Sequence, residues 1–290
     1  MTRRATLMTM PPPATPHAPC PIDQAIVAKM QTRLLGWYAD NGRDLPWRHT
    51  RDPYAILVSE IMLQQTQVPR VIPKFAAFLA AYPRLEDLAR APLDDVLRHW
   101  RGLGYNNRAR RLRDCAAAAV AAAAGSHAEL PRTVADLRDL PGIGPYTARA
   151  VLVFAHNDDL AAVDANVRRV LTHELSLPVD LGDRELQTVA EGAVPRGRSR
   201  DWHNALMDYG ALVLTARATG IAPRTRQGAF KGSRRWYRSR LLQALLDGGP
   251  QRLDQLAATL DVTLDVAAEL ADLLSRDGLV RRDGDRVQVA

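Results

Sequence analysis

Two carboxylates in the sequence stand where they could do acid–base and electrostatic chemistry. Glu60 lies four residues after Ile56 and three before Leu63 in the run VSEIMLQQTQV, so it falls in the apolar stripe of an expected helix. Burial there would raise the pKa of its carboxyl group, which suits a general acid. A buried glutamate that pairs with an arginine is the other interpretation, and the sequence leaves both open.

The second carboxylate, Asp164, precedes an apolar-periodic helix in the run AVDANVRRVL. As an N-cap, it would accept hydrogen bonds from the free N–H groups of that helix. Alternatively, a carboxylate that faces a sugar C1′ can stabilise an oxocarbenium-like transition state or attack it, as in glycoside hydrolysis. With Glu60 as the acid, this second interpretation indicates cleavage of a bond to a sugar.

The run LPGIGPYTA at 140–148 stands one helix before Asp164, between a helical segment that starts near Val134 and one that extends to about Phe154. Gly142 and Gly144 allow a tight turn, and the proline that follows opens the next helix. Free N–H groups at a helix start bind phosphate. The run predicts a helix-hairpin-helix that holds the DNA backbone without reading sequence, with an ordinary helix corner as the alternative.

Charge and composition narrow the class of protein. The 290 residues carry 39 basic and 32 acidic side chains, a net charge of +7, and the stretch from Arg217 to Arg240 holds basic residues and no acidic one. Such a one-sided run makes nucleic acid a candidate partner, with a solvated face as the equal alternative. The 47% hydrophobic content can form a sizeable core. Without an 18-residue apolar run or an apolar leader, we expect a cytoplasmic, nucleoid-associated monomer.

The cysteine and histidine content bears on metals and cofactors. Cys20 and Cys115 are the two cysteines, which excludes a disulfide framework and an all-cysteine metal or iron–sulfur site. The seven histidines include no pair at the spacing of a helical metal site. We therefore expect no metal and no cofactor.

Helical spacing repeats from Ile22 to about Ala222, and strand-like alternation is nearly absent there, so this block is predicted to be all-α. Asp52 and the proline after it mark the start of one helix. Ile26, Met30 and Leu34 are expected on the buried face of the first helix.

The C-terminal part has a different pattern. Helices are expected over 236–246, 253–260 and 267–274, and the segments 279–282 and 286–289 flank an Asp-Gly-Asp turn that predicts a hairpin. Three helices and a β-hairpin form the outline of a winged helix. Its third helix carries Asp265, Glu269 and Asp272 instead of a basic face, so a partner-binding domain stays an alternative to a nucleic-acid reader.

Taken together, these runs closely resemble the MutY-type adenine DNA glycosylases of the helix-hairpin-helix (HhH-GPD) superfamily. The resemblance covers roughly residues 30–215 and includes LPWR at 45–48, MLQQTQV at 62–68 and GLGY at 102–105. It implies a two-lobed helical glycosylase fold, to which the residue pattern adds the C-terminal winged-helix-like domain. The predicted divisions are a disordered proline-rich tail over 1–21, a glycosylase domain over 22–222 (a six-helix lobe over 51–157, a second lobe over 22–50 and 158–222), a basic linker over 223–235 and the last domain over 236–290.

The resemblance also implies roles for individual residues. Asp164 would stabilise or capture the sugar cation, and Glu60 would protonate adenine N7. Tyr146 and Asn166 match residues that orient these carboxylates and relay protons. The residues implied in DNA and base binding are the hairpin glycines Gly142 and Gly144, Tyr105 as the wedge that enters the base stack, Gln65 and Thr66 near the orphaned base, Arg48 at the adenine pocket, and Asn204 at the adenine edge. As alternatives, Tyr105 could anchor a loop and Arg48 could form a structural ion pair.

Several positions depart from the family pattern. Lyase relatives carry a lysine where this chain has Tyr146, which implies a monofunctional enzyme. Leu214 stands at the place of the first cluster cysteine, which implies a member without the iron–sulfur cluster. Asn204 replaces the usual glutamine or glutamate. The last fifty-five residues cannot form the family's Nudix-like domain, so the base opposite the adenine stays open.

The sequence therefore predicts a monofunctional DNA glycosylase of base excision repair that removes adenine mispaired with 8-oxoguanine or guanine in double-stranded DNA. A thymine or uracil mismatch glycosylase acting opposite guanine is the first alternative, which Glu60 disfavours because thymine has no N7 to protonate. A non-catalytic DNA-binding module is the second, and the two carboxylates disfavour it.

Overall fold

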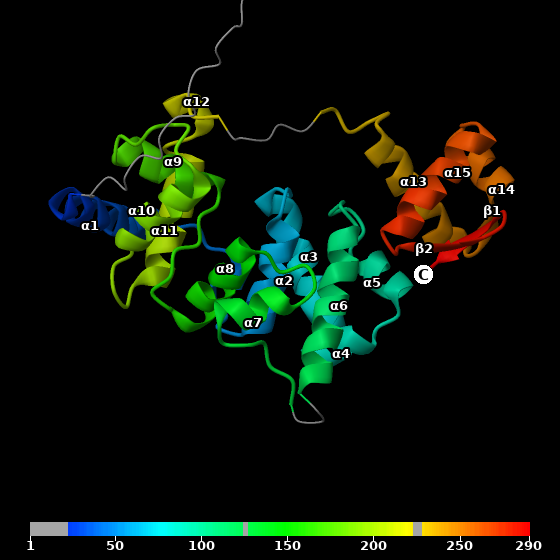
Figure 1. Cartoon of the computed structure of the whole chain (residues 1–290), viewed down its shortest axis with the longest axis horizontal. Helices are drawn as coiled ribbons and strands as arrows, with labels where there is room; N and C mark the ends of the chain where they lie inside the picture. The colour runs from blue at the N-terminus through cyan, green and yellow to red at the C-terminus, as the bar shows by residue number, and fades with distance from the viewer. Residues whose placement is uncertain (1–22, 124–126, 223–227) are drawn as a thin grey trace, which may run out of the picture.

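A computed structural model describes residues 23–123, 127–222 and 228–290, which are mainly helical (Figure 1). The mainly α fold class predicted from the sequence is confirmed. The predicted tail over 1–21 and part of the linker over 223–235 lie outside the described residues. Within the described ranges, no helix is both long and apolar enough to cross a membrane.

Twelve α-helices and one short 3₁₀ helix make up the described part before the linker. They are α1 (Gln24–Asn41), η1 (Pro46–Arg48), α2 (Pro53–Leu63), α3 (Val68–Ala81), α4 (Leu85–Arg90), α5 (Leu93–His99), α6 (Asn107–Ala122), α7 (Val134–Asp139), α8 (Pro145–His156), α9 (Ala165–Glu174), α10 (Asp183–Gly192), α11 (Ser199–Leu212) and α12 (Ala216–Thr219). As predicted, Asp52 caps α2, because its carboxylate accepts from the N–H groups of Tyr54 and Ala55.

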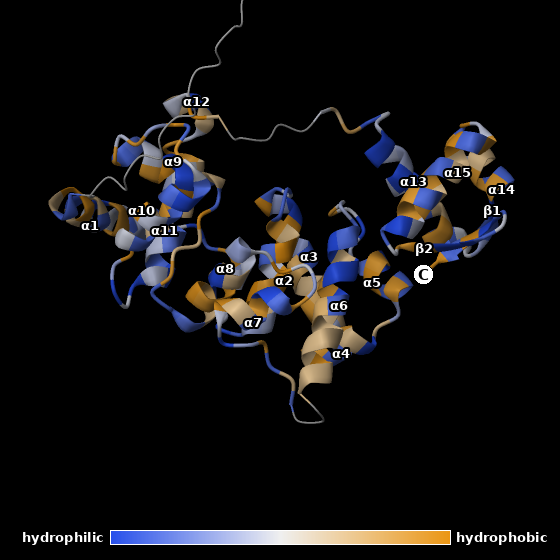
Figure 2. Cartoon of the chain, in the orientation of Figure 1, coloured by the Kyte–Doolittle hydropathy of each residue, from blue (hydrophilic) through white to orange (hydrophobic). Residues whose placement is uncertain are grey.

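Buried apolar side chains fall into two clusters. The first is formed by α2 to α8 and also takes in leucines of the C-terminal domain. The second joins α1 to α9, α10 and α11, and includes Leu34, Val170 and Trp202. Residues 51–157 hold seven α-helices, α2 to α8, where six were predicted. Figure 2 shows apolar residues along α2 and α5. The chain therefore leaves the second cluster after α1, builds the first, and returns to the second at α9.

One expected core residue is placed differently. Met30 and Leu34 are buried in α1 as predicted, but Ile26 is 50% exposed and Val27 takes its place at 1% exposure. Residues 27, 30 and 34 follow the i, i+3, i+7 spacing of one helix face. Ile26 lies one position off that face, in the first turn of the helix.

The C-terminal domain contains α13 (Arg234–Gly248), β1 (Gln251–Arg252), α14 (Leu253–Leu260), α15 (Leu264–Arg276), β2 (Val280–Asp283) and β3 (Arg286–Val289). The predicted hairpin is β2–β3, with Gly284 at φ +58° in its turn. The short strand β1 was not predicted from the sequence. It pairs antiparallel with β3 and completes a three-stranded sheet of order β1-β3-β2.

Candidate active site

Glu60 is buried in the middle of α2, where every residue from Tyr54 to Met62 is buried. The Tyr146 hydroxyl, from the first turn of α8, donates a hydrogen bond to the Glu60 carboxylate. Burial raises the pKa of Glu60 to about 7, and the nearby charge of Asp164 acts in the same direction, while the Tyr146 hydrogen bond lowers it. At neutral pH this carboxyl is therefore close to half protonated, as a general acid requires.

Asp164 is the N-cap of α9, and its carboxylate is held by two donors. Its Oδ1 accepts from the Val167 N–H at 2.7 Å, and its Oδ2 accepts from the Asn166 amide at 2.9 Å. Burial raises the pKa of Asp164, while these hydrogen bonds and the charge of Arg169 act in the opposite direction. The capping and the chemical interpretations of Asp164 are thus compatible, since the capping bonds also orient the carboxylate.

Arg169 connects Asp164 to the end of α11 through Asn166. Its guanidinium donates to the Asn166 Oδ1 at 2.6 Å, to the Gly210 carbonyl at 2.7 Å and to the Leu214 carbonyl at 2.6 Å. Because the Asn166 carbonyl oxygen is occupied by Arg169, its amide NH₂ must point to Asp164. The loop after α11, which contains Leu214, is thereby joined to the candidate active site.

A buried histidine of α11 fixes the segment that precedes Asp164. The Nε2 of His203 accepts from the Ala162 N–H at 2.9 Å, and its Nδ1 donates to the Ser199 carbonyl at 2.7 Å. Burial lowers the pKa of His203 to about 4, so the ring is neutral and keeps this acceptor. Asp164 is therefore positioned from both sides. His203 fixes the backbone at Ala162, two residues before Asp164, and Asn166 holds the Asp164 carboxylate from the helix that follows.

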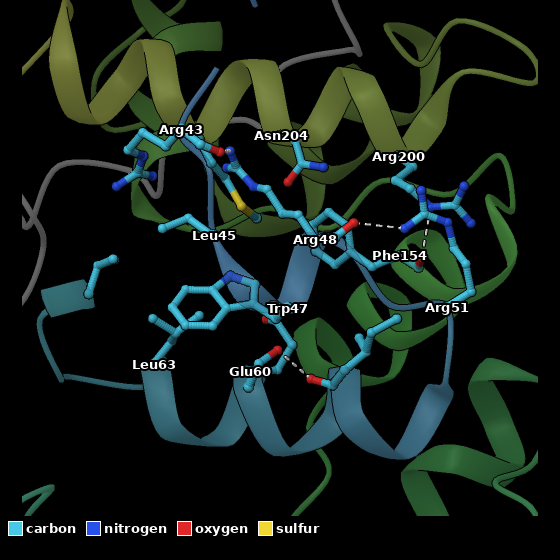
Figure 3. Close-up of a pocket in the computed structure, with 14 residues that line it drawn as sticks. Arg43, Leu45, Trp47, Arg48, Arg51, Glu60, Leu63, Phe154, Arg200 and Asn204 are labelled. Carbon is cyan, nitrogen blue, oxygen red and sulfur yellow. Dashed lines mark hydrogen bonds between the residues drawn. The ribbon is translucent and has the colours of Figure 1, made fainter. Parts of the chain in front are cut away.

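The two carboxylates line two different surface pockets, here called the first and the second hollow. Glu60 lines the first hollow, together with Trp47, Arg48, Phe154 and Asn204. Figure 3 shows Glu60 rising from α2 toward Trp47, with Asn204 entering from α11 on the opposite side. Asp164 lines the second hollow together with Tyr146, Arg149, Arg168 and Asp183. Tyr146 connects the two sides, because it lines the second hollow and bonds to Glu60, which lines the first.

Arg48 does line the first hollow, and it also forms the structural ion pair considered as an alternative. Its two Nη atoms bond to the fully buried carboxylate of Asp208 at 2.7 and 2.8 Å, and Arg43 shares that carboxylate. These partners hold the pKa of Asp208 below its usual value against the effect of burial. The Arg48 Nε is buried and has no hydrogen-bond partner among the described residues. Arg48 therefore lines the first hollow with a guanidinium that Asp208 already fixes.

Gln65, Thr66 and Tyr105 lie on two neighbouring turns, and Arg108 of α6 joins those turns. Gln65 and Tyr105 both have left-handed backbone conformations, at φ +55° and +47°, which non-glycine residues rarely adopt. The Arg108 guanidinium donates to the Thr66 hydroxyl at 3.1 Å and to carbonyls of both turns, including that of Gly104 at 3.0 Å. Arg108 therefore fixes the two turns to each other. Gln65, Thr66 and Tyr105 line neither the first nor the second hollow.

The predicted hairpin is formed by α7, a turn and α8. Gly142 has φ +81°, and a Cβ there would lie 2.8 Å from the Arg111 Cβ, so the turn requires glycine at this position. Gly144 is the N-cap of α8 at φ −89°, and a Cβ there would meet no protein atom. The geometry of the turn therefore does not require glycine at position 144. Because Gly144 has no side chain, the free N–H groups at the start of α8 stay accessible to a ligand such as a phosphate.

Sequence reasoning missed four residues that organise the site: Arg108, Arg169, His203 and Asp208. Each acts through partners that are distant in the chain, such as the 160 residues between Arg48 and Asp208. For the arginines and the aspartate, the sequence did offer one signal, which is a charged residue at a helix position expected to be buried. Such a residue is rarely buried without a partner of opposite charge or a set of hydrogen bonds.

Comparison with known proteins agrees with this geometry. Residues 58–193 match the HhH-GPD superfamily of base excision DNA repair proteins. The adenine DNA glycosylase of Mycolicibacterium smegmatis is 39% identical over 277 residues, which cover 87% of this chain and 92% of that protein. The mouse adenine DNA glycosylase is 40% identical over 206 residues, 67% of this chain, but the match spans only 39% of the mouse protein.

A solved structure of a thermostable thymine-DNA glycosylase is also similar. It superposes with a TM-score of 0.63 at 32% sequence identity, over 68% of this chain and 91% of that one. The fold, the paired carboxylates and the matches to the relatives agree. The chain belongs to the HhH-GPD superfamily of base excision DNA repair proteins and, within it, to the MutY-type adenine DNA glycosylases.

Proposed function

We propose that this glycosylase removes adenine mispaired with 8-oxoguanine or guanine, after flipping the nucleotide out of the duplex. The observation that carries the proposal is the buried Glu60, whose pKa of about 7 keeps a proton available beside the first hollow. Protonation at N7 makes adenine a leaving group, whereas thymine and uracil have no N7. A general acid in this hollow therefore favours a purine substrate.

The proposed reaction divides the work between the two carboxylates. Glu60 gives its proton to adenine N7 as the bond between C1′ and the base breaks, and the bonding electrons leave with the base. Asp164 carries the negative charge that stabilises the sugar cation. Water then adds to C1′ and releases a proton to bulk water, which leaves an abasic site. Glu60 takes up a proton from bulk water and is again an acid. Tyr146 keeps Glu60 oriented through its hydrogen bond, and Asn166 does the same for Asp164.

The walls of the first hollow support a purine ligand. Asn204, buried on α11, carries an amide that can both donate to and accept from an adenine edge. The Arg48 side chain, held by Asp208, lines the same hollow. Trp47 supplies an aromatic face.

We further propose that the enzyme is monofunctional. Cleavage of the strand by a lyase needs an amine that attacks C1′ and forms a Schiff base. Among the described residues that line the two hollows, none is a lysine. Tyr146, at the family's lysine position, has its pKa raised by burial and by the two carboxylates, so its hydroxyl stays protonated and is a poor nucleophile.

The family's iron–sulfur cluster does not fit the residues of this chain. A cluster of this kind takes four cysteine thiolates, and the chain has two cysteines. Cys115 is buried in the first apolar cluster, where burial raises the pKa of its thiol to about 12. Arg169 instead ties the loop at Leu214 to the protein. We propose that the enzyme works without a cluster.

A thymine or uracil mismatch glycosylase is the second candidate, and the similar solved structure of a thymine-DNA glycosylase favours it. Single-turnover assays on duplexes with A opposite 8-oxoguanine, A opposite G, T opposite G and U opposite G distinguish the two, each read with and without alkali. We expect adenine release that becomes strand cleavage only after alkali. Thymine or uracil release would favour the second candidate, and cleavage without alkali would contradict the monofunctional proposal.

The two hairpin glycines give a matched pair of variants that tests the DNA-backbone contact. Gly144→Ala should leave the melting temperature unchanged but weaken binding to duplex DNA by about tenfold, because its methyl group blocks hydrogen bonds from the α8 N-terminus to a phosphate. Gly142→Ala should instead destabilise the fold by roughly 1 kcal/mol or more, because of its positive φ and the contact with Arg111. Thermal melting and fluorescence anisotropy measure the two effects.

If Gly144→Ala binds duplex DNA as tightly as the parent protein, the phosphate does not approach the N-terminus of α8, and the hairpin is only a helix corner.

A further inference from the structure

The C-terminal domain packs against the lobe formed by α2 to α8. Leu241 and Leu245 of α13 belong to the same buried cluster as the residues of α5. Two arginines of that lobe bond to the end of α13: Arg98 donates to the Leu246 carbonyl, and Arg101 pairs with Asp247 at 2.5 Å. Figure 1 shows α13 beside α5. These contacts fix the C-terminal end of α13 against α5 and the turn that follows it.

Arg235, in the first turn of α13, contacts Tyr105 directly. Its Nη1 donates to the Tyr105 hydroxyl at 2.6 Å, and its guanidinium lies 5.8 Å from the ring centroid. The Arg108 guanidinium lies 5.6 Å from the same centroid. Tyr105 is thus held by one arginine from its own lobe and by one from the C-terminal domain, at a backbone conformation that is unfavourable for tyrosine.

The helices α13 and α15 of the C-terminal domain carry opposite charges, since α13 begins with a basic turn and α15 is acidic. The helix α15 carries acidic residues, and two of them pair within the domain: Glu269 with Arg234 at 2.7 Å, and Asp272 with Arg282 at 2.6 Å. An acidic helix does not favour the major groove. Arg235, by contrast, bonds to a residue of the turn implied in duplex opening.

We propose that Arg235 is a positioning residue for the wedge, by which the winged-helix-like domain takes part in opening the mispair. It holds the Tyr105 ring in the orientation that enters the base stack, so the ring does not have to be ordered when DNA binds. The inference rests on the proposed function, and in particular on Tyr105 as the wedge. It assigns to the C-terminal domain a role in base flipping and not in the chemical step.

The test compares single-turnover adenine release by Arg235→Ala on two DNAs, a fully paired duplex around the mispair and a bubble in which the neighbouring pairs are also mismatched. We expect a loss of about tenfold on the duplex and of less than about threefold on the bubble, where little unstacking is needed. Arg235→Lys keeps the charge but not the planar fork, and should recover only part of the rate. Arg252→Ala removes the same charge from β1 and should match the parent protein on both DNAs.

A double-mutant cycle tests the coupling to Tyr105. Tyr105→Phe removes the hydroxyl that accepts from Arg235, so the double variant with Arg235→Ala should lose less on the duplex than the product of the two single losses. Equal losses of Arg235→Ala on duplex and bubble, or losses that multiply in the cycle, would overturn the inference.

Tyr105→Ala separates the inference from the proposed function. If that variant loses duplex activity while Arg235→Ala does not, the wedge stands and the role of Arg235 fails. If Tyr105→Ala retains full duplex activity, the wedge itself is wrong and the inference falls with it.

Discussion

Replacing Asp164 with asparagine should lower the single-turnover rate of base release by about 10³-fold, while duplex affinity stays within about twofold. The variant side chain still accepts from the Val167 N–H as a cap, but it carries no charge to stabilise the sugar cation. Its amide also faces the Asn166 amide, which cannot turn around because Arg169 holds its oxygen. Gel-resolved product formation and anisotropy measure the rate and the affinity.

Asp183→Asn is the matched control for this prediction. Asp183 lines the same second hollow and removal of its charge is the same chemical change, but its side chain is largely exposed and pairs with Arg168. That variant should retain the parent rate. A comparable loss in both variants would mean that the charge of the hollow as a whole matters, and Asp164 would lose its assigned role.

Glu60→Gln should lower the rate of adenine release by roughly 10²–10⁴-fold, because Glu60 is the one carboxyl among the described residues that line the first hollow. The pH dependence gives the sharper test. Glu60 must be protonated to act, so the parent rate should fall about tenfold per pH unit above its pKa of about 7. The residual rate of the variant should show no such step near pH 7. An unchanged parent rate between pH 7 and 9 would contradict the role of Glu60 as the acid.

The same pKa predicts an effect on stability with a defined sign. The folded-state pKa of Glu60 is raised from 4.5 to about 7, so between these values the native state binds a proton that the unfolded chain has lost. The free energy of unfolding therefore falls as pH rises through this window. Glu60→Gln removes the penalty and should stabilise the protein at pH 8, by at most roughly 3 kcal/mol, but not at pH 4. Urea unfolding at the two pH values measures the difference.

The local pattern of the sequence was sufficient to predict a mainly helical fold, several of its helices and both carboxylates as candidates. Glu60 could be found because it interrupts an apolar stripe, and Asp164 because it precedes one. The hairpin could be found because it depends on a few consecutive residues, although only Gly142 has the positive φ that a tight turn needs. Each of these features is determined by residues nearby in the sequence, within about two helical turns of the residue concerned.

What could not be predicted depends on partners that only the fold brings together. No local pattern pairs Arg48 with Asp208, or places His203 against the Ala162 amide. The contact between Arg235 and Tyr105 spans 130 residues. Ile26 was misplaced for a related reason, since the apolar positions near the start of α1 allow two neighbouring faces and only packing against α11 selects Val27.

The order in which the two apolar clusters are completed has a consequence for how the chain folds during synthesis. The first helix that the structure describes, α1, packs on α11, which begins only at Ser199. The whole of α2 to α8, whose helices pack mainly on one another, is made in between. Short-range contacts form faster than long-range ones, and domains fold as they emerge. The lobe of α2 to α8 can therefore assemble early, and α1 finds its partners only after that lobe has been made.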